Sequence, residues 1–87
     1  MNINITFRHM DHTPALDSMI REKSEKFTKW LGPSTLVNWT CWLEGSDHCS
    51  EVLVHSGSSE YFAKAQADDL YKTFDIVINK IHNQLSK

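Results

Sequence analysis

The spacing of hydrophobic residues switches between two periods along this chain, and the order of the switches constrains the fold. Between Ile3 and Phe7, apolar and polar residues alternate, which is typical of a strand with one buried face. A helical spacing then extends to Leu31. Thr13 can cap this segment and Pro14 suits the first helical position. The sequence therefore predicts a strand followed by a helix of about four to five turns.

The strand-like period returns three times between Thr35 and Ala67, with turn residues at 45–48 and 56–59. Each run places apolar residues on one face. The predicted core-facing residues are Val37, Trp39, Cys41 and Leu43, then Val52 and Val54, then Tyr61, Ala63, Ala65 and Ala67. Short turns between three strands predict an antiparallel meander.

A second helical spacing extends from Leu70 to the end of the chain, and Asp68 is the predicted N-cap, with Asp69 favourable at the positive end of the helix. The predicted order is β-α-β-β-β-α. The economical arrangement is an α+β fold with a four-stranded mixed sheet and both helices packed on one face.

The length of 87 residues predicts a single domain, residues 1–87. No apolar run is long enough to span a bilayer, and the polar stretch at residues 2–6 predicts no secretory signal, so we expect a cytoplasmic protein without membrane contact. In that compartment Cys41 and Cys49 should remain thiols.

The net charge of −2 makes the position of the charges more informative than their sum. A wheel of the last helix separates its apolar sector from a wedge that holds three lysines, two asparagines and Ile76, but no acid. The wedge contains Lys72, Asn79, Lys80, Asn83 and Lys87. Such a stripe suits contact with a row of phosphates, and the alternative is an ordinary solvated helix face.

The first helix adds Lys26 and Lys29 on one flank, beside two glutamates that could pair with them. Lys23 falls on the apolar face, where its stem can be buried while its ammonium reaches the groove between the helices. The alternative is a lysine at the helix boundary that simply reaches solvent.

Catalytic and metal-binding patterns are not found in the sequence. The histidines lack the paired spacing of zinc sites, the glycines are single turn residues, and Cys41 lies in mid-strand. We therefore expect no enzyme, catalytic residue, metal, cofactor or small-molecule substrate. Trp42 is predicted on the sheet face without helices, where it either binds a partner or covers the sheet, and a weak homo-oligomer through that open face is an alternative use.

Several segments in matching order resemble a known family. They are Asn4-Ile5-Thr6, Met10 to Leu16, Ser24 to Trp30, Asp69 to Lys72 and Ile78 to Lys87. The chain resembles short members of the bacterial ribosome hibernation-promoting factor and ribosome-associated inhibitor family, also called sigma-54 modulation proteins.

The resemblance implies a fold similar to double-stranded RNA-binding domains. It implies a partner, the small ribosomal subunit with its 16S rRNA, on which the protein blocks mRNA and tRNA binding. It also implies rRNA contact by basic residues at matching positions, namely Lys23, Lys26, Lys80 and Lys87, with Arg8 as a further basic position. The wheel extends this set to Lys29 and Lys72.

The sequence departs from the family at Asn83, where a basic residue is common, and it ends at Lys87 without the basic tail of many short members. These departures imply either a weaker affinity for ribosomes or a changed partner. The alternative function is a protein-interaction module of the same fold that has lost RNA affinity.

Overall fold

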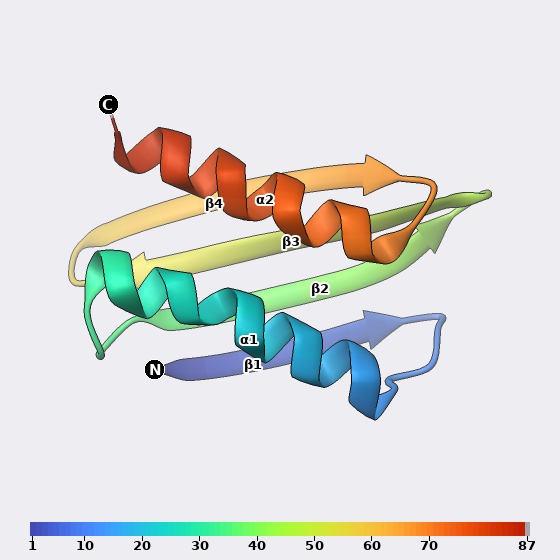
Figure 1. Ribbon diagram of the computed structural model, residues 1–87, viewed down its shortest axis with the longest axis horizontal. Coiled ribbons are helices and arrows are strands. Elements are labelled where there is room, and N and C mark those ends of the chain that lie inside the picture. Colours follow the sequence, from blue (N-terminus) through green and yellow to red (C-terminus); the bar gives the residue numbers. More distant parts are fainter. Residues whose placement is uncertain (87) are drawn as a thin grey trace.

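A computed structural model describes residues 1–86 as one sheet with two helices lying across the same face (Figure 1). The predicted element order is confirmed. The elements are β1 (Asn2–Arg8), α1 (Pro14–Leu31), β2 (Leu36–Glu44), β3 (Asp47–Ser56), β4 (Ser59–Ala67) and α2 (Leu70–Leu85). The α+β class with a mixed sheet and two helices on one face is therefore correct.

The four strands lie in the order β1-β2-β3-β4. β1 is parallel to β2, and the other two pairs are antiparallel. Gly45 and Gly57 begin the two hairpin turns at φ of +64° and +59°, in the left-handed region that favours glycine. Both turns are shorter than the sequence predicted, because the flanking residues already belong to the strands.

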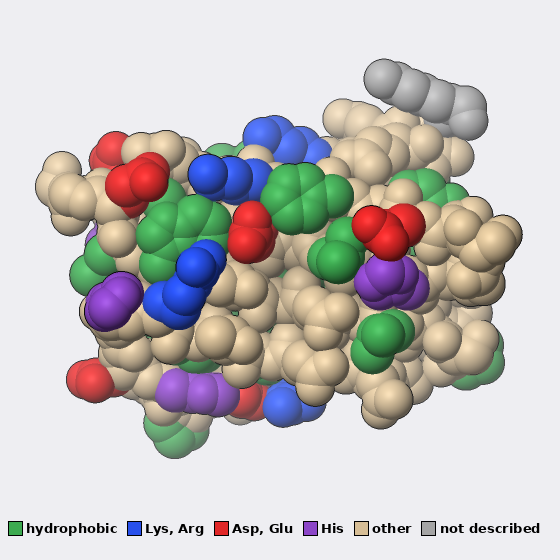
Figure 2. Space-filling model, turned by 180° about the vertical axis from the view of Figure 1, so that it is seen from behind, with side chains coloured by type: hydrophobic (Ala, Val, Ile, Leu, Met, Phe, Trp, Pro, Cys, Tyr) green, Lys and Arg blue, Asp and Glu red, His purple; other side chains and the backbone are tan. Residues whose placement is uncertain are grey.

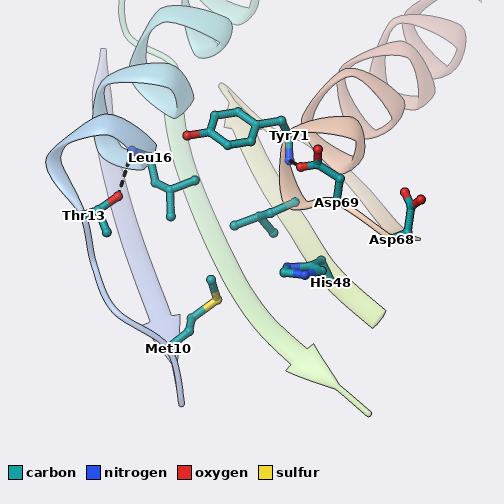
Figure 3. A pocket seen from close by; sticks show the side chains of 8 residues that line it. Met10, Thr13, Leu16, His48, Asp68, Asp69 and Tyr71 are labelled. Carbon is teal, nitrogen blue, oxygen red and sulfur yellow. Dashed lines mark hydrogen bonds between the residues drawn. The ribbon is translucent and has the colours of Figure 1, made fainter. Parts of the chain in front are cut away.

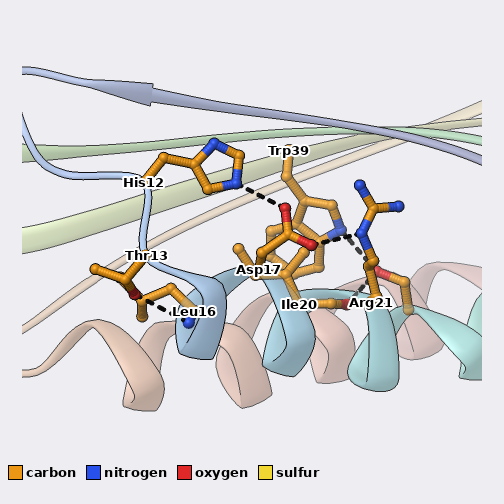
Figure 4. A network of polar contacts seen from close by, with 8 residues as sticks. His12, Thr13, Leu16, Asp17, Ile20, Arg21 and Trp39 are labelled. Atoms are coloured by element: carbon orange, nitrogen blue, oxygen red, sulfur yellow. Dashed lines mark hydrogen bonds and ion pairs between the residues drawn. The ribbon is translucent and has the colours of Figure 1, made fainter.

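Trp39 lies at the centre of the core between the sheet and the helices. The residue is 1 % exposed, and its ring meets Phe74 edge-on, with centroids 5.6 Å apart. Its Nε1 donates to Ser24 Oγ at 2.8 Å, and that hydroxyl donates to the carbonyl of Ile20 at 2.7 Å (Figure 4). The polar atoms that Trp39 and Ser24 bring into the core are thus paired, as buried polar groups must be.

Two details of the sequence prediction are wrong. The N-cap of α2 is Asp69, whose carboxylate accepts from the backbone N–H of Tyr71 at 2.9 Å, while Asp68 instead pairs with Lys72. Leu43 lies on the predicted face but is 43 % exposed, because it sits two residues before the β2–β3 turn, at the end of the sheet. The helix start at Thr13 is confirmed, since its hydroxyl accepts from Leu16 N at 3.2 Å.

Candidate nucleic-acid interface

The two helices run in the same direction across the sheet, so that both begin at one end of the molecule and end at the other (Figure 1). Lys23 of α1 forms an ion pair with Asp75 of α2, with Nζ 2.6 Å from Oδ1. Further along, Trp30 stacks on His82 with ring centroids 4.6 Å apart. These two contacts hold the helices at a fixed spacing.

The ends of the helices form a basic end, which we define as Lys26, Lys29 and Lys80. No acidic residue occurs between Lys26 and Leu31 or between Ile76 and Ser86. Lys26 and Lys29 are exposed and form no ion pair with any residue the structure describes. Lys80 Nζ donates to the carbonyl of Lys64 on the β4 edge at 2.6 Å, which positions its ammonium beside the sheet.

The starts of the helices form an acidic end, which we define as Asp11, Asp17, Asp68 and Asp69. Asp17 accepts from Arg21 at 2.6 Å and lies 2.6 Å from His12 (Figure 4), and these hydrogen bonds lower the pKa of Asp17. A hydrogen bond from Lys72 similarly lowers the pKa of Asp68. Carboxylates are favourable here because each helix start carries partial positive charge.

The structure distinguishes the predicted lysines by what they already contact. Lys23 does reach the groove between the helices, as predicted, but its charge is opposed there by Asp75. Lys72 is likewise paired with Asp68 across one helical turn at 2.9 Å. Within residues 1–86, these two lysines are therefore less available to an outside anion than Lys26 and Lys29.

Two further predicted polar residues, Asn79 and Asn83, are exposed on α2. Their amides can hydrogen-bond a phosphate or a sugar. Lys87 lies outside the described residues.

Arg8 lies on the opposite face of the molecule from the helices. Its guanidinium lies over the ring of Trp42, 5.1 Å from the centroid, and Lys64 Nζ is 5.2 Å from the same centroid. Figure 2 shows this open sheet face, with basic side chains bordering a group of hydrophobic ones. The structure therefore does not bring Arg8 together with the helix lysines.

Trp42 is half-buried on the open face, and cations border its ring. This observation favours the interpretation of Trp42 as cover for the sheet. Phe62 is the large apolar residue that remains most open on that face, at 50 % exposure.

In the part of the chain that the structure describes, nucleophilic and metal-binding groups are not assembled into a site. Burial raises the pKa of the Cys41 thiol to about 12, and it also raises the pKa of Cys49. Both cysteines are free and buried. Across residues 1–86, no three His, Cys, Asp or Glu side chains gather closely enough to hold a metal ion. Over the same residues, no helix has the length and apolar character needed to cross a membrane.

Comparison with solved structures defines the class of fold. The structure superposes on the Thermus thermophilus Protein Y N-terminal domain with a TM-score of 0.90 at 19 % identity, covering 98 % of this chain and 96 % of that one. It superposes on a ribosomal subunit interface protein from Coxiella burnetii with a TM-score of 0.85 at 26 % identity, covering 99 % and 94 %.

Sequence comparison defines the family. Residues 3–87 match the family described as sigma 54 modulation protein / S30EA ribosomal protein, and this chain belongs to that family. It is 29 % identical over 87 residues to the ribosome hibernation promoting factor of Escherichia coli K12, covering 100 % of this chain and 92 % of the relative. It is 30 % identical over 91 residues to the ribosome-associated factor Y of Haemophilus influenzae, covering 100 % and 81 %.

Membership of this family confirms both the resemblance found in the sequence and the prediction that the protein is not an enzyme. Three residues of the surface were missed from the sequence. Asp75, Tyr71 and Lys64 received no role in the sequence analysis, and the structure places Asp75 on the side of α2 that faces α1. The partners of Asp75 and Lys64 lie far away in sequence, and no local pattern reveals such contacts.

Proposed function

We propose that this protein is a ribosome hibernation factor that acts in the cytoplasm. In this proposal it binds the small ribosomal subunit through the backbone of 16S rRNA and blocks mRNA and tRNA binding. The observation that carries the proposal is the basic end, where Lys26 and Lys29 are exposed and free of acidic partners among the described residues. The names of the relatives, which include ribosome hibernation promoting factor, support the same function.

The geometry suits recognition of an RNA backbone rather than of bases. Lysines act as point charges on phosphates and carry no information about base identity. Asn79 and Asn83 add hydrogen-bonding groups on α2. Because the Lys23–Asp75 pair and the Trp30–His82 stack fix the helices, the positive charges are held in a constant pattern that can match the shape of a folded RNA.

Co-sedimentation with purified small ribosomal subunits at low and physiological salt tests the proposal. We expect the protein to bind, with an affinity that falls steeply with salt as phosphate counterions are released. The triple variant Lys26→Glu, Lys29→Glu and Lys80→Glu should lose at least about 100-fold in affinity, because three contacts become repulsive.

The matched control is Lys64→Glu, which reverses a charge on the open sheet face beside Trp42. It should retain nearly the affinity of the parent protein. The control changes the net charge by two units and the triple variant changes it by six, so a loss in the control of about one third of the triple variant's loss, on a logarithmic scale, would show that only net charge matters. An absence of binding at both salt concentrations would contradict the proposal.

A second candidate function is suggested by the half-exposed Phe62 on the open sheet face. In this alternative the protein pairs with a second copy or another protein through that face and has no RNA affinity. Sedimentation equilibrium distinguishes the two candidates. Self-association abolished by Phe62→Ser, together with no subunit binding, would favour the alternative, whereas a monomer that binds subunits would favour the hibernation factor.

A further inference from the structure

A groove opens between the starts of the two helices, at the acidic end of the molecule. Its volume is about 340 Å³, and it is lined by side chains from the loop before α1, from both helices and from β3 (Figure 3). Met10, Leu16 and Leu70 provide apolar walls, and Asp68 and Asp69 provide carboxylates. None of the lysines of the basic end lines this groove.

Tyr71 gives the groove an aromatic wall. The side chain is 43 % exposed and extends from α2 towards the start of α1 (Figure 3). Its ring packs edge-on against the buried Phe74, with centroids 6.0 Å apart. An exposed tyrosine ring held in place in this way can receive a cation over its face.

The charge of this end decides which partner the groove accepts. Arg21 and Lys72 offset two of the four carboxylates of the acidic end, so Asp11 and Asp69 remain, and of these two Asp69 lines the groove. The two helix starts contribute the equivalent of only about one positive charge together. A cation is therefore favoured at this end, and a polyanion such as RNA is disfavoured.

From the groove, its aromatic wall and its charge, we infer that it binds a basic peptide segment of a partner protein in which an arginine or lysine lies beside an apolar residue. The stem of the basic residue fits the apolar wall, its charged head meets Tyr71 and the carboxylate of Asp69, and the neighbouring apolar side chain contacts Met10 and Leu16. This inference is independent of RNA binding, because it concerns the opposite end of the helix layer.

The test is an NMR titration of the full-length, ¹⁵N-labelled protein with a short blocked peptide in which arginines flank a leucine. We expect saturable shifts confined to residues 10–16, His48 and residues 68–72. Tyr71→Ala should weaken binding about fivefold, whereas Tyr71→Phe, which keeps the ring, should bind like the parent protein. Asp69→Asn should also weaken binding severalfold, because it removes the charged partner while asparagine can still cap α2.

Two controls separate the groove from general attraction to acidic residues. Glu25→Gln removes an equal charge from an exposed site elsewhere on α1 and should not change binding. A peptide in which glycine replaces leucine should bind more weakly than the original. The inference would be overturned if no shifts appear at the groove, if the glycine peptide binds equally well, or if a short single-stranded RNA shifts the groove residues instead.

Discussion

The basic and acidic ends are built from the same two helices, yet they present opposite charges. At the acidic end, two of the four carboxylates are paired with Arg21 or Lys72 and a third, Asp69, caps α2. At the basic end, Lys26 and Lys29 have no acidic partner among the described residues. Most charges at the acidic end thus stabilise the fold, whereas Lys26 and Lys29 at the basic end are available to an anionic partner.

The direction of the helices explains this difference. Acids are favourable at a helix start and bases at a helix end, and the effect is local to each helix. Because α1 and α2 run in the same direction, the two local preferences add to give one charge polarity for the whole helix layer. A net charge of −2 therefore coexists with a concentrated positive surface.

Removal of Trp30 should have the largest effect among changes that leave the charge of the basic end unaltered. Trp30→Ala removes the stack on His82 and a partly buried side chain, so we expect a loss of about 2–3 kcal/mol in the free energy of unfolding. Subunit affinity should fall as well, since the helices lose a contact that fixes their spacing. Urea unfolding and co-sedimentation measure the two effects. Trp30→Phe should have smaller effects on both the free energy of unfolding and the subunit affinity. A folded Trp30→Ala variant with full affinity would show that helix spacing is unimportant.

Removal of the N-cap of α2, at the acidic end, should lower the stability of the protein without changing its affinity for the subunit. Asp69→Ala should lower the free energy of unfolding by about 1 kcal/mol, because the N–H of Tyr71 loses its partner. Subunit affinity should not change at temperatures where the variant is folded. Asp68→Ala is the control, and thermal unfolding should show a smaller effect for it. A larger effect at Asp68 would contradict the assignment of Asp69 as the cap.

Neutralisation of Asp75 should sharpen the contrast between paired and free lysines. Asp75→Asn removes the ion-pair partner of Lys23 and leaves its ammonium free. Subunit affinity should therefore rise, by a factor below about 10. The slope of log affinity against log salt should steepen by about 0.7 to 0.9, the value for one additional phosphate contact. Salt titrations of the variant and of Asp17→Asn, which lies at the acidic end, provide the comparison. An unchanged slope would indicate that Lys23 does not face the RNA.

The pH dependence of stability should show the smallest effect. The pKa of Asp17 is lowered by hydrogen bonds from Arg21 and His12, so its carboxylate stabilises the fold above its unfolded pKa. This contribution should disappear as the pH falls below about 4 and through the folded pKa. Unfolding free energies measured from pH 2 to 7 should therefore vary slightly less with pH in Asp17→Asn than in the parent protein. An identical pH profile for both proteins would contradict this role of Asp17.

Hydrophobic period and helix punctuation predict most of this fold from the sequence. Thr13, Pro14 and the alternation around Trp39 are local signals, and the structure follows them. The N-cap of α2 was predicted one residue too early. Either of two adjacent aspartates can serve as the N-cap, and only the backbone conformation decides between them. The position of Arg8 on the open face of the sheet was predictable, because successive side chains of β1 alternate between the two faces and Arg8 is not on the buried one.

Contacts between distant residues could not be predicted in the same way. Lys23 and Asp75 are 52 positions apart, and Lys80 contacts a backbone carbonyl of β4 rather than a side chain. The wheel of α2 gave the composition of the stripe but not the partners of its lysines. The sequence therefore predicted which residues are basic and exposed, whereas the structure was needed to show which of them are free.

An NMR titration with a helical fragment of 16S rRNA tests the central claim most directly, since it reports which end of the protein meets the RNA. The account predicts salt-sensitive shifts at Lys26, Lys29, Asn79 and Asn83, with no change at Met10, His48 or Tyr71. Shifts centred on Trp42 and Phe62 of the open sheet face, or on the acidic end, would contradict it.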